Sequence, residues 1–361
     1  MGMIHRILLL LPVAAIACFA PPALGGETKD EINRSFGLGP PQLVFSTEDQ
    51  KFHLAGGLDD VLFRRPRLEG EAHFEVPRAV RPLFDAPTRR VMAAVFVGVP
   101  LVGYFAWWSG GHQAWHFRNE GWFQSYTYAG GADKASHLTF SYMGTQALIG
   151  WYRSLGHTDE QARWLALGTT VIAGILVEIG DGTTQYGFSW EDATTNVIGG
   201  SLATEIDRLA FRDSFGMRWG LVKALKPDPC CRAGINYGDD YSKEIYDADF
   251  KLVGLLPRLG LKPGPARFFL LSITYGTKGY RFSPPANFER NLGLEIGLNL
   301  EEILHRIGVP ERKWWGKALF VVATHFRFPY SGWGIRYDFD HGRWRGPDFG
   351  DKFNPGSVIY N

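Results

Sequence analysis

The chain has little cysteine and no excess of charge of either sign. Three cysteines occur in 361 residues, and 38 lysines and arginines balance 37 aspartates and glutamates to a formal net charge of +1. Without a basic excess, a nucleic-acid-binding protein is not predicted. Cys230 and Cys231 are adjacent, a spacing that ordinary disulfide geometry disfavours, and no zinc-binding spacing is present. Free or intermolecularly paired thiols are therefore expected.

Motifs of common hydrolases and nucleotide-binding proteins are also missing. The sequence contains no G-x-S-x-G, no H-E-x-x-H and no P-loop. Aromatic residues are abundant instead, at 14%, with 12 tryptophans, and the chain has 44 glycines. This mixture is typical of membrane interfaces and of glycine-rich β structure.

The first residues are typical of an export signal. A short basic segment, an apolar run and a small-residue cleavage site predict a signal peptide over 1–26. Two alternatives stay open, an uncleaved membrane anchor and a lipoprotein attached through Cys18. The lipoprotein alternative ranks below ordinary cleavage, because Ala15 stands where a lipobox usually has leucine.

Two contrasting segments follow the signal. Residues 27–90 contain Pro-rich and charged stretches without a sustained period, which predicts an extended arm. Val91–Trp108 carries no charge and is long enough for a transmembrane helix, with a tryptophan pair at its end that suits an interface. A buried core helix is the alternative for this segment.

Three further helices are predicted after this segment. Thr158 with Gln161 forms a capping box and Ser189 is a helix-capping residue, so both mark helix starts. Small residues recur on all three helices, as in closely packed bundles. With Val91–Trp108 they predict a bundle of about four apolar helices over 91–210. The three predicted ranges are about 133–152, 159–178 and 189–209.

The pattern changes after the bundle. Residues 211–249 are polar and turn-rich and predict a linker. Within 250–361, apolar and small or polar residues alternate over Asn291–Leu300, which predicts a half-buried strand. An aromatic-rich segment over 314–326 predicts an amphipathic helix that could lie on a membrane surface. The fold class is therefore α+β, a helical bundle followed by a small antiparallel β-rich domain with short amphipathic helices.

Three of the predicted helices each carry polar residues at helical spacing. If these polar faces converge inside the bundle, they form one site of carboxylates, an imidazole and an amide. The residues are Asp133, His137 and Ser141 on the first helix, Glu178 and Asp181 on the second, and Asp192 and Asn196 on the third.

Three interpretations of this site stay open. In the first, His137 oriented by Asp133 performs acid–base chemistry on an envelope substrate. In the second, the site is a satisfied polar network that includes Lys134, Ser189 and Asn196. In the third, carboxylates from facing helices and one histidine hold a divalent cation, as in other bundles. The metal-binding residues would then be Glu178, Asp181, Asp192 and His137.

The same residues carry a resemblance to known proteins. D-K-A-S-H, E-I-G-D-G and G-F-S-W-E-D-A-T-T-N-V-I-G occur in this order between His116 and Leu209. In these motifs the chain resembles the YfiM-like family of predicted periplasmic lipoproteins, a domain of unknown function. More distantly, it resembles VanZ-like membrane proteins, which are linked to glycopeptide resistance. The resemblance implies a bacterial cell-envelope protein with shared polar positions: Asp133, Lys134, His137, Glu178, Asp181, Ser189, Asp192 and Asn196.

The sequence therefore predicts an exported, periplasmic and membrane-associated protein of the bacterial cell envelope. Its expected partners are membrane lipids or envelope components, and no nucleic acid. The leading function is a structural or binding role built around a buried polar site, with a divalent cation as the open alternative for what the site holds. The alternative is a metal-dependent or histidine-assisted hydrolase or transferase that acts on a lipid or cell-wall substrate.

Overall fold

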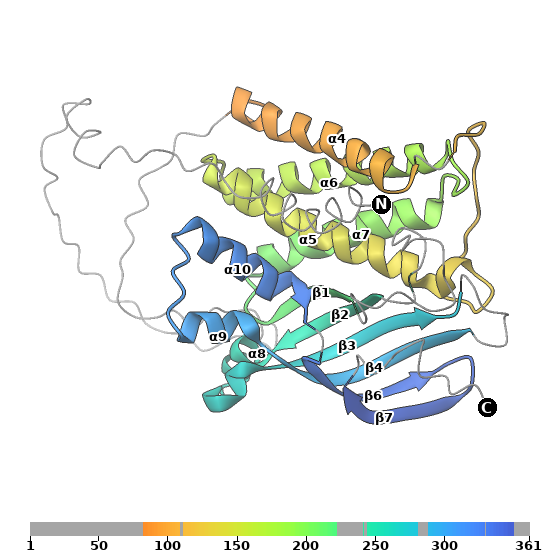
Figure 1. The fold of residues 1–361 in the computed structure, drawn as a ribbon. Coiled ribbons are helices and arrows are strands. Elements are labelled where there is room, and N and C mark those ends of the chain that lie inside the picture. The colour runs from red at the N-terminus through yellow and green to blue at the C-terminus, as the bar shows by residue number, and fades with distance from the viewer. Residues whose placement is uncertain are drawn as a thin grey trace, which may run out of the picture.

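A computed structural model describes residues 82–108, 111–221, 241, 244–280, 288–328 and 330–349. The predicted signal peptide, nearly all of the predicted arm, and Cys230 with Cys231 lie outside these residues. Figure 1 shows a layer of long helices stacked on a twisted sheet, with short helices gathered at one end of the sheet. The predicted α+β class, a helical bundle followed by a mostly antiparallel sheet, is confirmed.

The long helices begin where the sequence supplies caps. Asp85 and Ser189 each accept a hydrogen bond from a backbone N–H three residues on, and Thr158 forms the predicted capping box with Gln161. One helix lacks a side-chain cap and starts after Gly131, whose φ of 88° suits glycine. The four helices are α4 (Ala86–Ala106), α5 (Ala132–Ser154), α6 (Asp159–Asp181) and α7 (Trp190–Arg208).

Small residues let these helices approach one another closely. A Cβ at Gly199 of α7 would overlap the carbonyl oxygen of Leu138 in α5, so only glycine fits there. The α5–α6 contact is a core of Leu148, Ile149 and Tyr152 with small alanines opposite. Two helices, α4 and α6, are long and apolar enough to cross a membrane, by length and composition only, and the apolar window of α4 is 17% buried. For α4, this exposure disfavours the buried core helix that the sequence left open.

The sheet has seven strands in the order β5-β1-β2-β3-β4-β6-β7. Neighbouring strands are antiparallel except β1 and β5, which run parallel. Apolar side chains of α5 and α7 pack against β1, so the sheet shares a core with the bundle. The strands are β1 (Phe215–Leu221), β2 (Glu244–Lys251), β3 (Phe269–Lys278), β4 (Glu289–Leu298), β5 (Phe326–Arg327), β6 (Gly332–Asp338) and β7 (Arg343–Phe349).

The first two strands lie where the sequence predicted a polar linker, over 211–249. That prediction is corrected for the described parts of the segment, which contain β1 and most of β2. The strands were missed because their inward face is charged, through Arg218, Asp247 and Asp249. Charged residues at alternate positions hide the hydrophobic period that identifies an ordinary strand.

The strand predicted over Asn291–Leu300 is present as β4, but its buried face is the polar one. Leu292, Leu294 and Ile296 are 40–56% exposed, whereas Glu295 and the glycines beside it are buried. The apolar face continues across neighbouring strands, because Leu294 lies between Ile273 of β3 and Ile335 of β6. Among the described residues, helix α5 packs against this face at β1, β2 and β3. The large apolar side chains that β4 and β6 place on the same face are exposed.

The opposite face of the sheet encloses a network of ion pairs. Arg218 pairs with Asp249 at 2.5 Å, and Arg327 of β5 pairs with Asp247 of β2 at 3.1 Å and with Glu295 of β4 at 2.7 Å. In the strand order β5 and β4 are separated by three strands. A single arginine can reach β2 and β4 only because the sheet curls with its polar face inward.

Short helices lie together at one end of the sheet (Figure 1). The predicted aromatic-rich helix over 314–326 is confirmed as α10, and a short amphipathic helix precedes it as α9. Two further short elements follow β2. In chain order, the four short elements at this end are α8 (Leu252–Arg258), η4 (Gly264–Phe268), α9 (Leu300–Arg306) and α10 (Trp314–His325).

Candidate functional site

Helix ends bring the predicted polar residues together. The first turns of α5 and α7 and the last turns of α6 meet at one end of the bundle, because α5 packs against both other helices. The helical spacing in the sequence is preserved, so Asp133 and His137 share one face of α5, and Asp192 and Asn196 share one face of α7. The predicted convergence of three polar helix faces is therefore observed.

Lys134 is the centre of the cluster. Its side chain is fully buried, and its Nζ lies 2.5 Å from Glu120 Oε2, 3.0 Å from Asp133 Oδ2 and 2.9 Å from Asp192 Oδ1. A buried ammonium is stabilised only by such direct pairing. Asp133 also accepts a hydrogen bond from the hydroxyl of Tyr241. Lys134 thus neutralises acids on α5, on α7 and in the loop that precedes α5.

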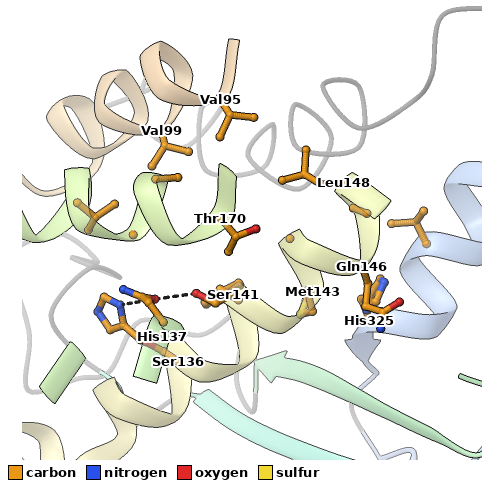
Figure 2. A pocket seen from close by; sticks show the side chains of 18 of the residues that line it. Val95, Val99, Ser136, His137, Ser141, Met143, Gln146, Leu148, Thr170 and His325 are labelled. Atoms are coloured by element: carbon orange, nitrogen blue, oxygen red, sulfur yellow. Dashed lines mark hydrogen bonds between the residues drawn. The ribbon is translucent and has the colours of Figure 1, made fainter. Parts of the chain in front are cut away.

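His137 lies beside this cluster and faces α6 and α7. Its Nε2 is 3.7 Å from Asp133 Oδ1, and its Nδ1 is 3.6 Å from Glu178 Oε1 and 3.2 Å from Asn196 Oδ1. The Asn196 oxygen also accepts a hydrogen bond of 2.7 Å from Ser141, one turn further along α5 (Figure 2). The Nδ2 of Asn196 is buried and has no hydrogen-bond partner among the described residues.

The charges of the cluster depend on one another. Burial alone would lower the pKa of His137, but Asp192, Asp133 and Glu178 outweigh it and raise the pKa to about 10. Burial opposes ionisation of Asp133, yet Lys134 and His137 hold its pKa below the usual range. Burial raises the pKa of Glu178 to about 8, with His137 opposing. At neutral pH Lys134 and His137 are therefore both cationic, whereas Glu178 is largely protonated. Fewer carboxylates are ionised in the cluster than the number of acidic residues implies.

Replacing His137 with glutamine is expected to destabilise the protein by about 1.5–3 kcal/mol near neutral pH, the usual value of a hydrogen bond to a charged group. The folded pKa of about 10 exceeds the ordinary value of 6.5, so the stabilisation is complete below pH 6.5 and is lost as the pH rises through 10. Urea titrations in mild detergent should show the wild-type and variant unfolding free energies converging over this range. A difference in unfolding free energy that stays constant over this pH range would contradict the raised pKa of His137.

The structure brings together a candidate metal-ligand group. Asp133, His137 and Asp192 each offer one ligand atom, and these atoms lie within 4.8 Å of one another. Lys134 already lies within 3.0 Å of both carboxylates, so a divalent ion would have to displace the ammonium as well as the imidazole proton. Asp181 points elsewhere, because its carboxylate accepts hydrogen bonds from the indoles of Trp107 and Trp108. Its role in metal binding remains a prediction, as does that of Glu178.

Sequence reasoning missed Glu120 and Tyr241. Both contact the cluster from segments outside the three helices, so no helical spacing connects them to it. Ser189 has the predicted capping role, and its backbone N–H also donates to Glu178 at 3.3 Å.

A long cavity of about 1220 Å³ opens beside the cluster. Its polar end is lined by Asp133, His137, Asp192 and Asn196, and it extends along α5 as far as Ser154. Figure 2 shows the cavity between α4 and α6 on one side and α10 on the other. The cluster is therefore accessible from a cavity and is not sealed inside the bundle.

Comparison with known families identifies the region that holds the site. Residues 119–206 match the family Predicted periplasmic lipoprotein (DUF2279). The DUF2279 region contains the three site-bearing helix ends and Glu120, whereas Tyr241 lies beyond it. No curated protein and no solved structure matches the chain. The family description agrees with the predicted location, a periplasmic, membrane-associated protein of the cell envelope.

Proposed function

We propose that this envelope protein binds an amphiphilic lipid in the long cavity, with the polar head at the His137 cluster. The observation that supports the proposal is the division of the cavity into a charged end at the His137 cluster and a mainly apolar remainder, which also includes Glu311 and Lys317 in its lining. Its volume of about 1220 Å³ exceeds that of an ordinary small-molecule site, which is about 300–1,000 Å³. A ligand with a large apolar part fits this space best.

The charged end favours a head group with hydroxyl or amino groups. The carboxylates of Asp133 and Asp192 line the cavity and accept hydrogen bonds, while the unpartnered Nδ2 of Asn196 can donate one. Buried polar atoms without partners are rare, and a ligand that satisfies them gains affinity. His137, protonated at neutral pH, adds a cationic donor at the same place.

The rest of the cavity favours acyl chains. Val95 and Val99 of α4 and Met143 and Leu148 of α5 line it (Figure 2), and Val321 of α10 belongs to the lining as well. At about 1.5 Å per residue, the 23 residues of α5 extend for about 34 Å. One leaflet of a bilayer core is about 15 Å thick, so a chain of membrane-lipid length fits within the cavity.

Hydrolysis or group transfer on the same lipid is the second candidate function. It is favoured by the position of His137 beside Asp133 at the wall of the cavity, where both can reach a bound head group. The two candidates share one ligand and differ in its fate. Bound lipid that stays intact during incubation supports binding alone, and release of a head group or acyl chain supports catalysis.

Substituting Gly144 with leucine is expected to weaken lipid binding by about 10-fold. A Cβ at Gly144 meets no atom within 4 Å, and the residue lines the cavity, so the leucine side chain would occupy ligand space. Expelling the ligand or moving the wall should cost about 1–3 kcal/mol. The measurement is the lipid-to-protein ratio after purification in mild detergent, with the lipid identified by mass spectrometry.

Gly168→Leu is the matched control. Gly168 also sits on a long helix with no atom within 4 Å of a Cβ, but it does not line the cavity. Both changes replace glycine within a helix and should raise helix propensity equally. Equal lipid content in wild type and Gly144→Leu would reject the cavity as the binding site, and so would an equal loss in both variants.

A further inference from the structure

Unpaired basic side chains gather at the end of the molecule formed by α8, η4, α9 and α10, here called the basic end. None of these side chains has an ion-pair or hydrogen-bond partner among the described residues, in contrast to the arginines of the sheet interior. Glu311 is the exposed acid at this end, and it pairs with His305 at 3.0 Å. The unpaired basic residues are Lys262, Arg306, Arg312, Lys313 and Lys317.

This concentration is local. The whole chain has a formal net charge of only +1. Outside the basic end, Arg90 is the one further lysine or arginine that has no ion-pair or hydrogen-bond partner for its side chain among the described residues. It lies near the start of α4, and Figure 1 shows the start of α4 on the same side of the molecule as α8, α9 and the start of α10. The unneutralised positive charge of the described chain therefore lies at one end.

Large apolar side chains are exposed among these charges. Leu259, Leu261, Ile307 and Trp314 are 56–78% exposed. Leu259 and Leu261 flank the turn after α8, Ile307 follows α9, and Trp314 begins α10. Apolar and aromatic groups interleaved with lysine and arginine are typical of surfaces that insert into the head-group region of a membrane.

We infer that the basic end docks onto a bilayer that contains anionic phospholipid. Charge complementarity selects this partner, because each lysine or arginine near an anionic leaflet is attracted to it, and the acid on this surface is already paired. The long side chains can keep their charges among the head groups while Leu261, Ile307 and Trp314 reach below them. The alternating chemistry fits a lipid surface better than an acidic protein, which would leave the apolar groups unburied.

Docking in this way also orients the long cavity. Trp314 and Lys317 belong to the basic end and line the cavity as well, so one wall of the cavity lies at the lipid surface. The inference goes beyond the proposed lipid binding, because docking depends on surface charge and would occur with the cavity empty.

The test compares partition of the full-length protein, diluted from mild detergent, onto two kinds of vesicle by flotation. One kind is neutral phosphatidylcholine, and the other also contains anionic phosphatidylglycerol. The apolar contribution is common to both, so the ratio of the two partition constants reports the charge contribution. Replacing Lys313 and Lys317 with glutamine is expected to lower this ratio by about 10- to 30-fold, given about 1 kcal/mol per charge.

Folding should not limit this test. Both lysines lie at the N-terminal end of α10, where removing positive charge favours the helix dipole. The control replaces Arg118 and Arg343 with glutamine, two partly exposed arginines outside the basic end. Arg118 donates hydrogen bonds to the carbonyls of Gln185 and Tyr186 at 3.2 and 3.4 Å, and Arg343 pairs with an acid at 3.4 Å. A ratio near one for wild type would overturn the inference, and so would equal falls in the two variants. Two results together would establish it: the ratio falls only in the lysine variant, and high salt brings the wild-type ratio close to one.

Discussion

Replacing Lys134 with methionine is expected to destabilise the protein by about 3–5 kcal/mol, the usual cost of removing one partner of a buried ion pair. Methionine preserves most of the volume of the side chain and removes only the charge. Glu120, Asp133 and Asp192 would then face one another without the ammonium that lies within 3.0 Å of each. The cations that remain nearby are His137 and a partly exposed arginine 3.9 Å from Glu120. Denaturant unfolding in mild detergent measures the loss.

Two further variants separate the electrostatic cause from packing. Adding Asp192→Asn to Lys134→Met removes one uncompensated acid and should recover part of the lost stability. Arg208→Met breaks an exposed pair with Glu205, where both side chains are more than a third exposed, and should cost at most about 1 kcal/mol. A double variant no more stable than Lys134→Met would show that the lysine acts through packing instead.

The sequence is most informative about the site where helix geometry alone determines position. Residues four apart on a helix must share a face, so the sequence alone groups Asp133 with His137 and Asp192 with Asn196, and the helices of the structure preserve both pairs. Caps set the starts of the helices, and close contacts such as Gly199 against α5 allow the faces to meet. The convergence of the three polar faces therefore follows from helical spacing and helix caps, together with the assumption that the three helices pack against one another.

The rest depends on tertiary contacts that no spacing encodes. Glu120 and Tyr241 reach Lys134 and Asp133 from segments that lack periodicity, so the charge balance of the site could not be completed from sequence. Asp181 has helical spacing to Glu178 but turns toward two indoles from the end of α4. Helical spacing determines which residues share a face. The partner that each side chain binds also depends on hydrogen-bond donors from other segments, such as the two indoles at Asp181.

In the sheet, too, the sequence predicts local structure but not tertiary contacts. The alternation in β4 correctly predicts a strand, but sequence alone does not say which face is buried. Here the apolar face of Leu292, Leu294 and Ile296 is exposed and the polar face is enclosed. The curl of the sheet brings arginines and acids from distant strands together inside it. Burial of charge in this way is stable only because each arginine meets carboxylates.

Replacing Arg327 with methionine is therefore the second change expected to have a large effect, about 3–5 kcal/mol. Arg327 and Arg218 face three carboxylates, those of Asp247, Asp249 and Glu295. Burial raises the pKa of Asp247 to about 6, and the two arginines oppose the rise. Loss of Arg327 leaves one arginine with three acids, so ionised groups remain buried without compensation. The measurement is again the unfolding free energy in mild detergent.

Asp247→Asn is the informative control, because it lies in the same network and changes the charge in the opposite direction. It leaves two arginines with two acids, a balanced interior, and the asparagine oxygen can still accept a hydrogen bond. The expected cost is about 1–2 kcal/mol, mainly from weaker hydrogen bonds to Arg218 and Arg327. If Asp247→Asn proved as damaging as Arg327→Met, charge balance would not be what stabilises the enclosed face. A clear difference would show that the curl of the sheet depends on compensated charge.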